Sequence, residues 1–234
     1  MSPKQKGQQR TAQAIPPTET IFSLHDLSFS YDGRRKQLDK INFALWPGEN
    51  VALNGSNGAG KTTLFRCITG LNKAQAGEIR LGADLINTEK DFYKLRGMVG
   101  YALQHADDQL FFPTVLEDLA FGPLNLGFTA TQAKERALQS LELVGLNGYE
   151  ERLSHQLSGG EKRLVALASI LAMQPRALLL DEPLTGLDTK AQERISAVIA
   201  NLNCAKVIIA HDHEFLNSIC TRQLLLKEGH LETC

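Results

Sequence analysis

One stretch of sequence decides the fold: Gly55-Ser56-Asn57-Gly58-Ala59-Gly60-Lys61-Thr62. It matches the pattern GxxxxGK followed by Ser or Thr, comes after the short apolar segment 51–53 and opens a segment that ends near Gly70. The glycines let successive backbone N–H groups point at phosphate oxygens, and the dipole of a following helix adds to the attraction. A chance glycine turn is the alternative. The order of strand, glycine-rich loop and helix predicts a phosphate-binding site in an α/β fold.

The same loop contains residues suited to binding a nucleoside triphosphate. Lys61 would neutralise the β- and γ-phosphates, and the Thr62 hydroxyl would ligate Mg²⁺. The predicted nucleotide-binding residues of the loop and the first helical turn are Gly55, Ser56, Asn57, Gly58, Ala59, Gly60, Lys61, Thr62 and Thr63. Mg²⁺ is therefore the expected cofactor and ATP the expected substrate.

The apolar pattern on either side of the loop predicts the rest of the architecture. Apolar residues alternate over 24–31 and 41–45 around turn residues, which indicates antiparallel strands. The continuous apolar runs 177–180 and 207–210 are typical of strands buried on both faces, and segments with helical spacing separate them. The predicted fold is an α/β P-loop NTPase with a mostly parallel central sheet, an antiparallel β subdomain and a helical subdomain inserted at about 105–160.

An acidic pair ends one of the buried runs, in Leu178-Leu179-Leu180-Asp181-Glu182. An aspartate at the end of a buried strand can hold Mg²⁺ directly or through water, and the adjacent Glu182 would be the general base that polarises the attacking water. A solvated acidic turn after a strand is the alternative. In a chain that also carries Lys61, the pair predicts hydrolysis of the bound nucleotide.

A third motif, Leu157-Ser158-Gly159-Gly160-Glu161, precedes a helix with apolar residues at helical spacing. The serine hydroxyl and the first amides of the helix could bind an anion, and a capped helix with a glycine entry is the alternative. Because the motif comes shortly before Asp181, it resembles the signature sequence of ATP-binding cassette (ABC) ATPases. The resemblance implies one ABC ATPase domain over 21–234. The segment 1–20, which is rich in Lys, Gln, Pro and Thr, is predicted to be a disordered tail.

Four further residues stand in the order and spacing of that family. Gln104 resembles the Q-loop glutamine, Asp188 the D-loop aspartate and His211 the switch histidine. Tyr31 stands where the family places an aromatic ring that stacks on adenine. Taken singly they could be a solvated glutamine, a helix N-cap, a turn histidine and a core tyrosine. The resemblance implies catalytic roles for Lys61, Gln104, Glu182 and His211, and Mg²⁺ ligation by Thr62, Gln104 and Asp181.

The signature motif also implies a second ATPase domain. In this family the signature serine closes over the γ-phosphate that a partner domain holds, so two ATP molecules are sandwiched at one interface. The residues expected to act in trans are Ser158, Gly159, Gly160 and Asp188. Because this chain has one set of motifs, it is expected to pair with a second ABC ATPase chain, and the intact set is compatible with a homodimer.

Two neighbouring segments, 99–111 and 114–123, resemble the ATPase components of energy-coupling-factor importers, which take up vitamins and cobalt or nickel ions. The chain departs from that group at His105-Ala106, where Asn-Pro is commoner, and at Leu184-Thr185-Gly186, where Thr-Ala-Gly is usual. The resemblance implies two membrane partners, a transmembrane coupling subunit and a substrate-binding subunit. It places this chain as a peripheral protein on the cytoplasmic face of the cell membrane. An ATPase of another ABC transporter, a soluble non-transport ABC protein and an inactive homologue are the alternatives.

Composition bears on these alternatives. The formal net charge of −1 provides no basic field for nucleic acid, so no nucleic-acid partner is expected. No apolar run approaches the length of about 18 residues that a membrane span needs. Lys61, Asp181, Glu182 and His211 are all present, which argues against an inactive homologue.

An acidic pair, Asp107 and Asp108, lies just after Gln104 and beside the apolar segment 110–112. In the importers that this chain resembles, that region borders the groove that receives short helices with exposed arginines from the membrane subunit. The pair is predicted to hydrogen-bond such arginines while the apolar residues provide burial. A solvated turn over a buried Leu-Phe-Phe anchor is the alternative.

Overall fold

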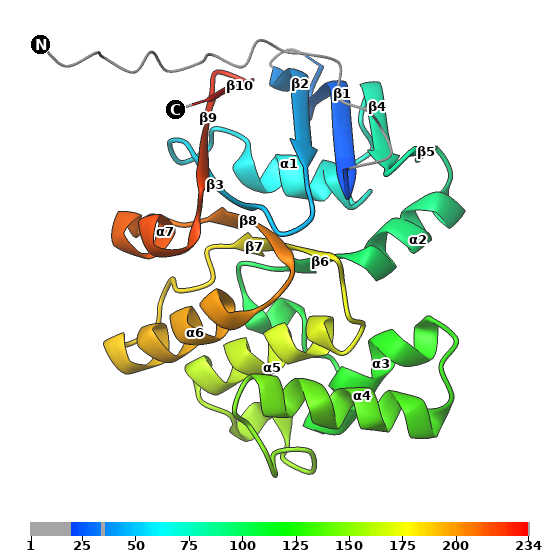
Figure 1. Ribbon diagram of the computed structural model, residues 1–234, viewed down its shortest axis with the longest axis vertical. Helices are drawn as coiled ribbons and strands as arrows, with labels where there is room; N and C mark the ends of the chain where they lie inside the picture. The colour runs from blue at the N-terminus through cyan, green and yellow to red at the C-terminus, as the bar shows by residue number, and fades with distance from the viewer. Residues whose placement is uncertain (1–19, 34–35, 234) are drawn as a thin grey trace, which may run out of the picture.

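The chain folds into two β-sheets with helices between and beside them (Figure 1). The computed structural model describes residues 20–33 and 36–233, so the predicted tail lies outside the described residues except for Thr20. The smaller sheet has the strand order β2-β1-β4-β5, and its pairs are all antiparallel. Its strands are β1 (Phe22–Ser30), β2 (Lys36–Leu45), β4 (Ala76–Leu81) and β5 (Asp84–Leu85). The alternating pattern over 24–31 and 41–45 thus predicted the pairing of β1 with β2 correctly.

The larger sheet forms the centre of the molecule and has the strand order β10-β9-β3-β8-β7-β6. Its strands are β3 (Asn50–Asn54), β6 (Val99–Ala102), β7 (Ala177–Asp181), β8 (Ala205–Ile209), β9 (Arg222–Lys227) and β10 (His230–Thr233). The pairs β3–β8, β3–β9, β6–β7 and β7–β8 are parallel, and β10 pairs with β9 in antiparallel fashion at one edge. The mostly parallel central sheet of the prediction is confirmed.

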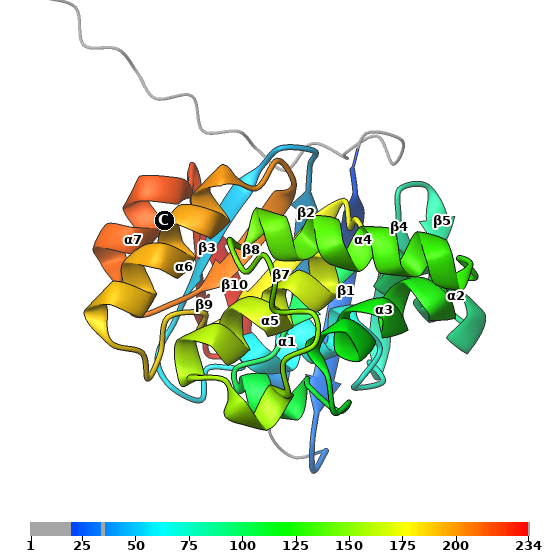
Figure 2. The same cartoon turned by 90° about the horizontal axis from the view of Figure 1, so that it is seen from below.

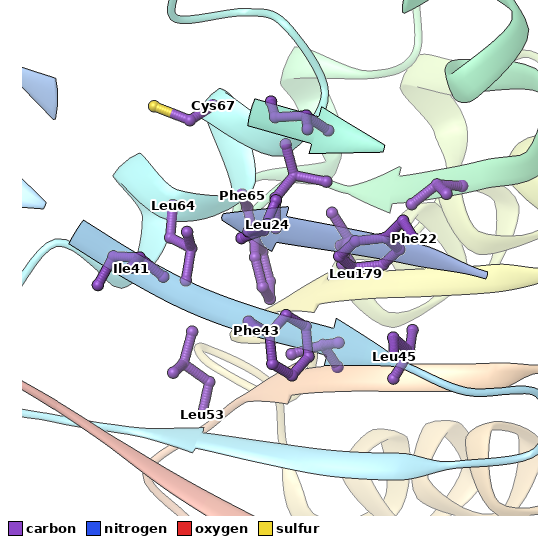
Figure 3. Close-up of a cluster of buried hydrophobic side chains, with 14 of the residues drawn as sticks. Phe22, Leu24, Ile41, Phe43, Leu45, Leu53, Leu64, Phe65, Cys67 and Leu179 are labelled. Atoms are coloured by element: carbon purple, nitrogen blue, oxygen red, sulfur yellow. The ribbon is translucent and has the colours of Figure 1, made fainter. Parts of the chain in front are cut away.

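Helix α1 (Lys61–Ile68) lies between the two sheets and fills the space with apolar side chains. Figure 3 shows Phe65 of α1 among Leu24 of β1, Phe43 of β2 and Leu179 of β7. Each of these side chains is buried, and full burial of a Leu or Phe side chain contributes about 1.5–3 kcal/mol. This shared core ties the start of α1 to the central sheet.

The opposite face of the central sheet carries a second core. Leu178 and Leu180 of β7 point to this face, whereas Leu179 points to the first core, which explains the uninterrupted apolar run of this strand. Three helices cover the face: α5 (Gly159–Leu171), α6 (Thr189–Asn201) and α7 (His213–Ile219). The strand ends of the sheet are therefore held between two packed layers.

A helical subdomain is inserted between β6 and α5. It contains α3 (Val115–Asn125) and α4 (Ala130–Leu143), and these helices pack on each other and on α5 at the end of the molecule opposite the small sheet (Figures 1 and 2). Two short 3₁₀ turns, η1 (Ala106–Asp108) and η2 (Ser154–Gln156), flank it, and α2 (Glu89–Met98) precedes β6. No helix in the described part of the chain combines the length and the apolar character needed to cross a membrane.

Candidate active site

The phosphate loop connects β3 to α1, and two of its glycines have conformations that exclude a side chain. Gly60 has φ 108°, and a Cβ there would lie 2.8 Å from the carbonyl oxygen of Gln37. Gly55 has φ 151°, and its Cβ would lie 2.6 Å from the carbonyl oxygen of Leu226. Gly60 is the N-cap of α1 and makes no side-chain capping bond, and the first turn contains no acidic residue. The first amides of α1 are thus left for an anion.

Lys61 begins α1 and is 9% exposed. Its Nζ donates to the carbonyl oxygens of Gly55 at 2.7 Å and Ser56 at 3.1 Å, so the ammonium lies across the loop. Burial lowers the pKa of Lys61, and the carboxylates of Glu182 and Asp181 oppose that shift. The loop therefore holds a partly desolvated positive charge where the phosphate groups are predicted to bind.

Asp181 is the last residue of β7 and is 2% exposed. Burial raises its pKa, while hydrogen bonds from the Thr62 and Tyr101 side chains and the charge of Lys61 lower it. The Tyr101 hydroxyl lies 3.1 Å from the Asp181 carboxylate. Tyr101 was not predicted as a site residue, and it reaches the site because β6 pairs with β7 and places it opposite Leu179.

The oxygen atoms near Asp181 fit a magnesium ion. Mg²⁺ prefers oxygen ligands and is usually bound through one or two carboxylates together with substrate phosphates. Asp181 supplies a carboxylate, Thr62 supplies a hydroxyl hydrogen-bonded to it, and Gln104 is among the residues that line the same cavity. Among the described residues there is no group of three or more His, Cys, Asp or Glu side chains that could hold a metal by themselves. A magnesium site here would therefore depend on the bound nucleotide.

Glu182 follows β7 in an uncommon backbone conformation. Its φ is 51°, in the left-handed region that costs a non-glycine residue about 1–3 kcal/mol. A hydrogen bond from its amide to the carbonyl oxygen of Ile209, 2.9 Å long, supports that conformation. Its carboxylate Oε1 lies 3.2 Å from Nε2 of His211, and its Oε2 accepts a 2.9 Å hydrogen bond from the Thr185 hydroxyl. Both oxygens of the predicted base are therefore oriented by neighbours.

A cavity of about 630 Å³ brings these groups together. Of the predicted residues it is lined by Tyr31, Asn57, Gly58, Ala59, Gly60, Lys61, Thr62, Thr63, Gln104, Asp181, Glu182 and His211, whereas Gly55 and Ser56 lie outside its lining. Tyr31 is 60% exposed, so the alternative of a core tyrosine is wrong. Its hydroxyl lies 3.3 Å from Oγ1 of Thr63, which leaves the ring at the cavity mouth as a surface on which a base can stack.

The four residues expected to act in trans are not among those that line this cavity. Ser158 caps α5 in a reciprocal arrangement with Glu161, and Asp188 caps α6 by accepting a 2.9 Å hydrogen bond from the Ala191 amide. Hydrogen bonds from Tyr149 and Ser158 lower the pKa of Glu161 to about 2. Ser158 and Asp188 therefore serve as helix caps within the chain, and none of the four residues lines the cavity at the phosphate loop of the same chain.

The phosphate loop, the acidic pair and the shared cavity define a nucleotide-hydrolysing site on a P-loop fold. Residues 38–185 match the family model described as ABC transporter. A putative ABC transporter ATP-binding protein of Brucella suis is 47% identical over 211 residues, which cover 90% of this chain and 87% of that protein. The energy-coupling factor transporter ATP-binding protein EcfA of Methanothermobacter thermautotrophicus is 44% identical over 90% of this chain and 69% of its own length.

Two solved structures agree with these sequence matches. The structure of cbiO1 from Clostridium perfringens, described as part of the ABC transporter complex cbiONQ, has a TM-score of 0.81, is 31% identical and covers 92% of this chain and 87% of its own. A dimeric ATP-binding cassette in a post-hydrolysis state bound to ADP and Pi has a TM-score of 0.79, is 25% identical and covers 91% of this chain and 98% of its own. This chain belongs to the ABC transporter family and is an ATPase, the ATP-binding subunit of a transporter.

Proposed function

We propose that this chain is the ATP-hydrolysing subunit of an energy-coupling-factor importer for a transition-metal ion or a vitamin, and that it acts on the cytoplasmic face of the cell membrane. Its 44% identity to EcfA carries the proposal, and the likeness to cbiO1 supports it. The ATPase of another kind of ABC transporter is the second candidate, because the Brucella relative is described only as an ABC transporter ATP-binding protein. The membrane chains that co-purify with this protein would distinguish the two.

In the proposed reaction Glu182 accepts the proton of the water that attacks the γ-phosphate, and His211 holds the carboxylate in place from its Oε1 side. Lys61 and the first amides of α1 bind the phosphates, and Tyr31 stacks on the base. Bound Mg²⁺, held by Thr62, Asp181 and Gln104, would supply positive charge to the phosphate oxygens. Ser158, Gly159, Gly160 and Asp188 would complete the site of a second ATPase chain, which makes a dimer the active unit.

Glu182→Gln tests this assignment. The amide cannot accept the proton, so turnover should fall by about 100- to 10,000-fold, whereas the phosphate loop is unchanged and ATP should still bind. The purified variant should accumulate as an ATP-bound dimer on gel filtration. Phosphate release at the wild-type rate would remove Glu182 from its role as the base.

A groove next to the nucleotide site suits a helix of the proposed transmembrane coupling subunit. It has a volume of about 460 Å³, and its lining includes Tyr93, Phe111, Phe121 and Met173. Phe111 is 75% exposed, which contradicts the alternative of a buried Leu-Phe-Phe anchor. An exposed aromatic side chain at a groove is typical of an interaction site.

The acidic pair lies beside this groove in η1. Asp107 forms a 2.6 Å ion pair with Lys162 and keeps 76% of its side chain exposed, and Asp108 is also exposed. These carboxylates would accept hydrogen bonds from arginines of the partner helix while the groove buries its apolar side. The exchange Asp107→Asn with Asp108→Asn should therefore weaken capture of the membrane subunit and transport, with ATP hydrolysis by the free chain retained.

The measurement is a pull-down of the membrane subunit at low and at high salt. Because ionic contacts are screened at high salt, the difference between wild type and double variant should be larger at low salt. Unchanged capture and transport would contradict docking at the acidic pair. An equal loss of hydrolysis by the free chain would show that the two acids serve the nucleotide site instead.

A further inference from the structure

A threonine outside the predicted site hydrogen-bonds to Glu182 at its acidic end, and an arginine hydrogen-bonds to that threonine. Thr185 donates from Oγ1 to Oε2 of Glu182 at 2.9 Å. The Thr185 amide also approaches the Glu182 carbonyl oxygen at 3.3 Å, which closes a tight turn after the strand end. Thr185 is thus bonded to both the backbone and the carboxylate of the proposed base.

Arg163, a residue of α5, holds the turn that contains Thr185. Its guanidinium donates to the carbonyl oxygens of Leu103, at 3.1 Å, and of Gln104 on one side, and to that of Thr185, at 3.3 Å, on the other. Burial lowers the pKa of Arg163, and the Asp181 carboxylate opposes that shift. One side chain therefore fastens the Gln104 segment and the turn after Glu182 to α5.

We propose that Thr185 is a positioning residue for Glu182, and that Arg163 holds Thr185 in the place where its hydroxyl meets the carboxylate. This inference rests on the proposed role of Glu182 as the general base. A carboxylate can rotate about its last side-chain bonds, and only one orientation directs a free lone pair at the attacking water. His211 restrains Oε1 and Thr185 restrains Oε2, so the two contacts together fix the plane of the carboxylate.

The arrangement also explains why these contacts belong to catalysis rather than to binding. Thr185 lines the nucleotide cavity, but its hydroxyl is committed to Glu182 and not to the phosphate loop. A group that orients the base acts mainly in the transition state, because the bound nucleotide does not need the base. Loss of the Thr185 hydroxyl should therefore lower kcat with little change in KM for ATP.

Thr185→Val and Thr185→Ser form a matched pair of variants. Valine keeps the shape without the hydroxyl, and serine keeps the hydroxyl without the methyl group. We expect Thr185→Val to lower kcat by about 10-fold at unchanged KM, the effect of one hydrogen bond to a charged group, and Thr185→Ser to stay within about threefold of wild type. Equal kcat values for Thr185→Val and wild type would overturn the inference, and so would a loss in Thr185→Ser as large as that in Thr185→Val.

Arg163→Lys tests the second contact. A lysine cannot reproduce the forked contacts to three carbonyl oxygens, so kcat should fall, and the loss should not add to that of Thr185→Val because both act on the same carboxylate. Additive losses would show that Arg163 acts by a route that does not include Thr185, such as the Gln104 segment, and would overturn its proposed role. A loss of thermal stability without a change in kcat would show a merely structural role for Arg163. Measuring Glu182→Gln in the same assay distinguishes a failure of the proposed base from a failure of the positioning role of Thr185. If it retains turnover, the assignment of the base fails. If it loses turnover while Thr185→Val does not, only the positioning role fails.

Discussion

The starts of α1 and α5 are built in opposite ways, although both carry glycines and both are predicted to meet phosphate. Helix α1 begins after Gly60, without a side-chain cap and without an acid in its first turn. Helix α5 begins after Ser158, which forms a reciprocal capping box with Glu161. The Ser158 amide donates to the Glu161 carboxylate at 2.8 Å, and the Glu161 amide lies 3.3 Å from the Ser158 hydroxyl oxygen.

The charged residues at the two helix starts also differ: the one in α1 is unfavourable to the helix dipole, and the one in α5 is favourable. A cation near the N-terminus of a helix is unfavourable because it meets the positive end of the dipole, and Lys61 stands there. Glu161 has the favourable sign, and its pKa is lowered to about 2. The start of α1 is therefore arranged for an anion that the chain does not contain. The start of α5 is already satisfied by its own residues and offers an anion only the Ser158 hydroxyl and the next amides.

The largest expected effect, on ATPase activity, comes from variants that damage the start of α1 in one chain and the start of α5 in another chain. Lys61→Ala removes the charge that faces the phosphates and should weaken ATP binding by about 10- to 100-fold. Ser158→Arg places a large side chain where a partner's γ-phosphate would sit and should lower turnover by at least about 100-fold. Mixed dimers of the two variants hold one site that lacks both residues and one that is intact, so some ATPase activity should return on mixing.

Steady-state phosphate release from the single variants and from their mixture is the measurement. Lys134→Ala, an exposed change on α4, serves as the control that mixing and purification leave turnover unaffected. Full activity of Ser158→Arg as an obligate monomer would refute the shared site.

An intermediate effect should distinguish the two glycines at the start of α5. A Cβ at Gly160 would lie 2.9 Å from Cβ of Ala191 in α6, whereas a Cβ at Gly159 meets nothing within 4 Å. Gly160→Ala should therefore lower the free energy of unfolding by about 1–3 kcal/mol through overpacking. Gly159→Ala should raise it by about 0.5–1 kcal/mol, since alanine favours the helix, and should lower turnover by obstructing the open amide. Urea unfolding of both variants checks this, and equal stabilities would contradict the contact with α6.

The smallest expected effect, on stability, comes from removing the hydrogen bond that Tyr149 donates to Glu161. Tyr149 donates to its carboxylate at 2.6 Å and is the main cause of its lowered pKa. Because the folded pKa of about 2 lies below the ordinary value of 4.5, the contribution of Glu161 to stability is present above pH 4.5 and is lost as the pH falls toward 2. Tyr149→Phe should therefore lower the free energy of unfolding by about 1 kcal/mol at pH 7 and by less at pH 3.

Urea unfolding at both pH values measures this difference. Tyr93→Phe is the matched control, because the Tyr93 hydroxyl donates to the Asn125 carbonyl oxygen, which does not titrate. Its cost should be the same at both pH values. If the loss of unfolding free energy in Tyr149→Phe were also the same at both pH values, Glu161 would not be the group that Tyr149 stabilises.

The parts of this molecule that could be predicted from the sequence are those encoded by short continuous segments. The run from Gly55 to Thr62 predicted the loop and α1, because curling a backbone around phosphate requires glycines at neighbouring positions. The apolar run before Asp181 predicted a strand buried on both faces, and alternating polarity predicted β1 paired with β2. The C-terminal pair β9 and β10 was not predicted.

The sequence by itself determined the class of fold, the ATPase chemistry and most of the residues around the cavity, because those features depend on the order of residues along short segments. Only the tertiary structure decided that Tyr101 meets Asp181, that Arg163 joins Leu103 to Thr185, and that Ser158 is not part of the lining of its own chain's cavity. These relations join residues far apart in the chain. They depend on the register of the parallel strands and on the packing of α5 against the sheet, and no spacing within one segment encodes either of them.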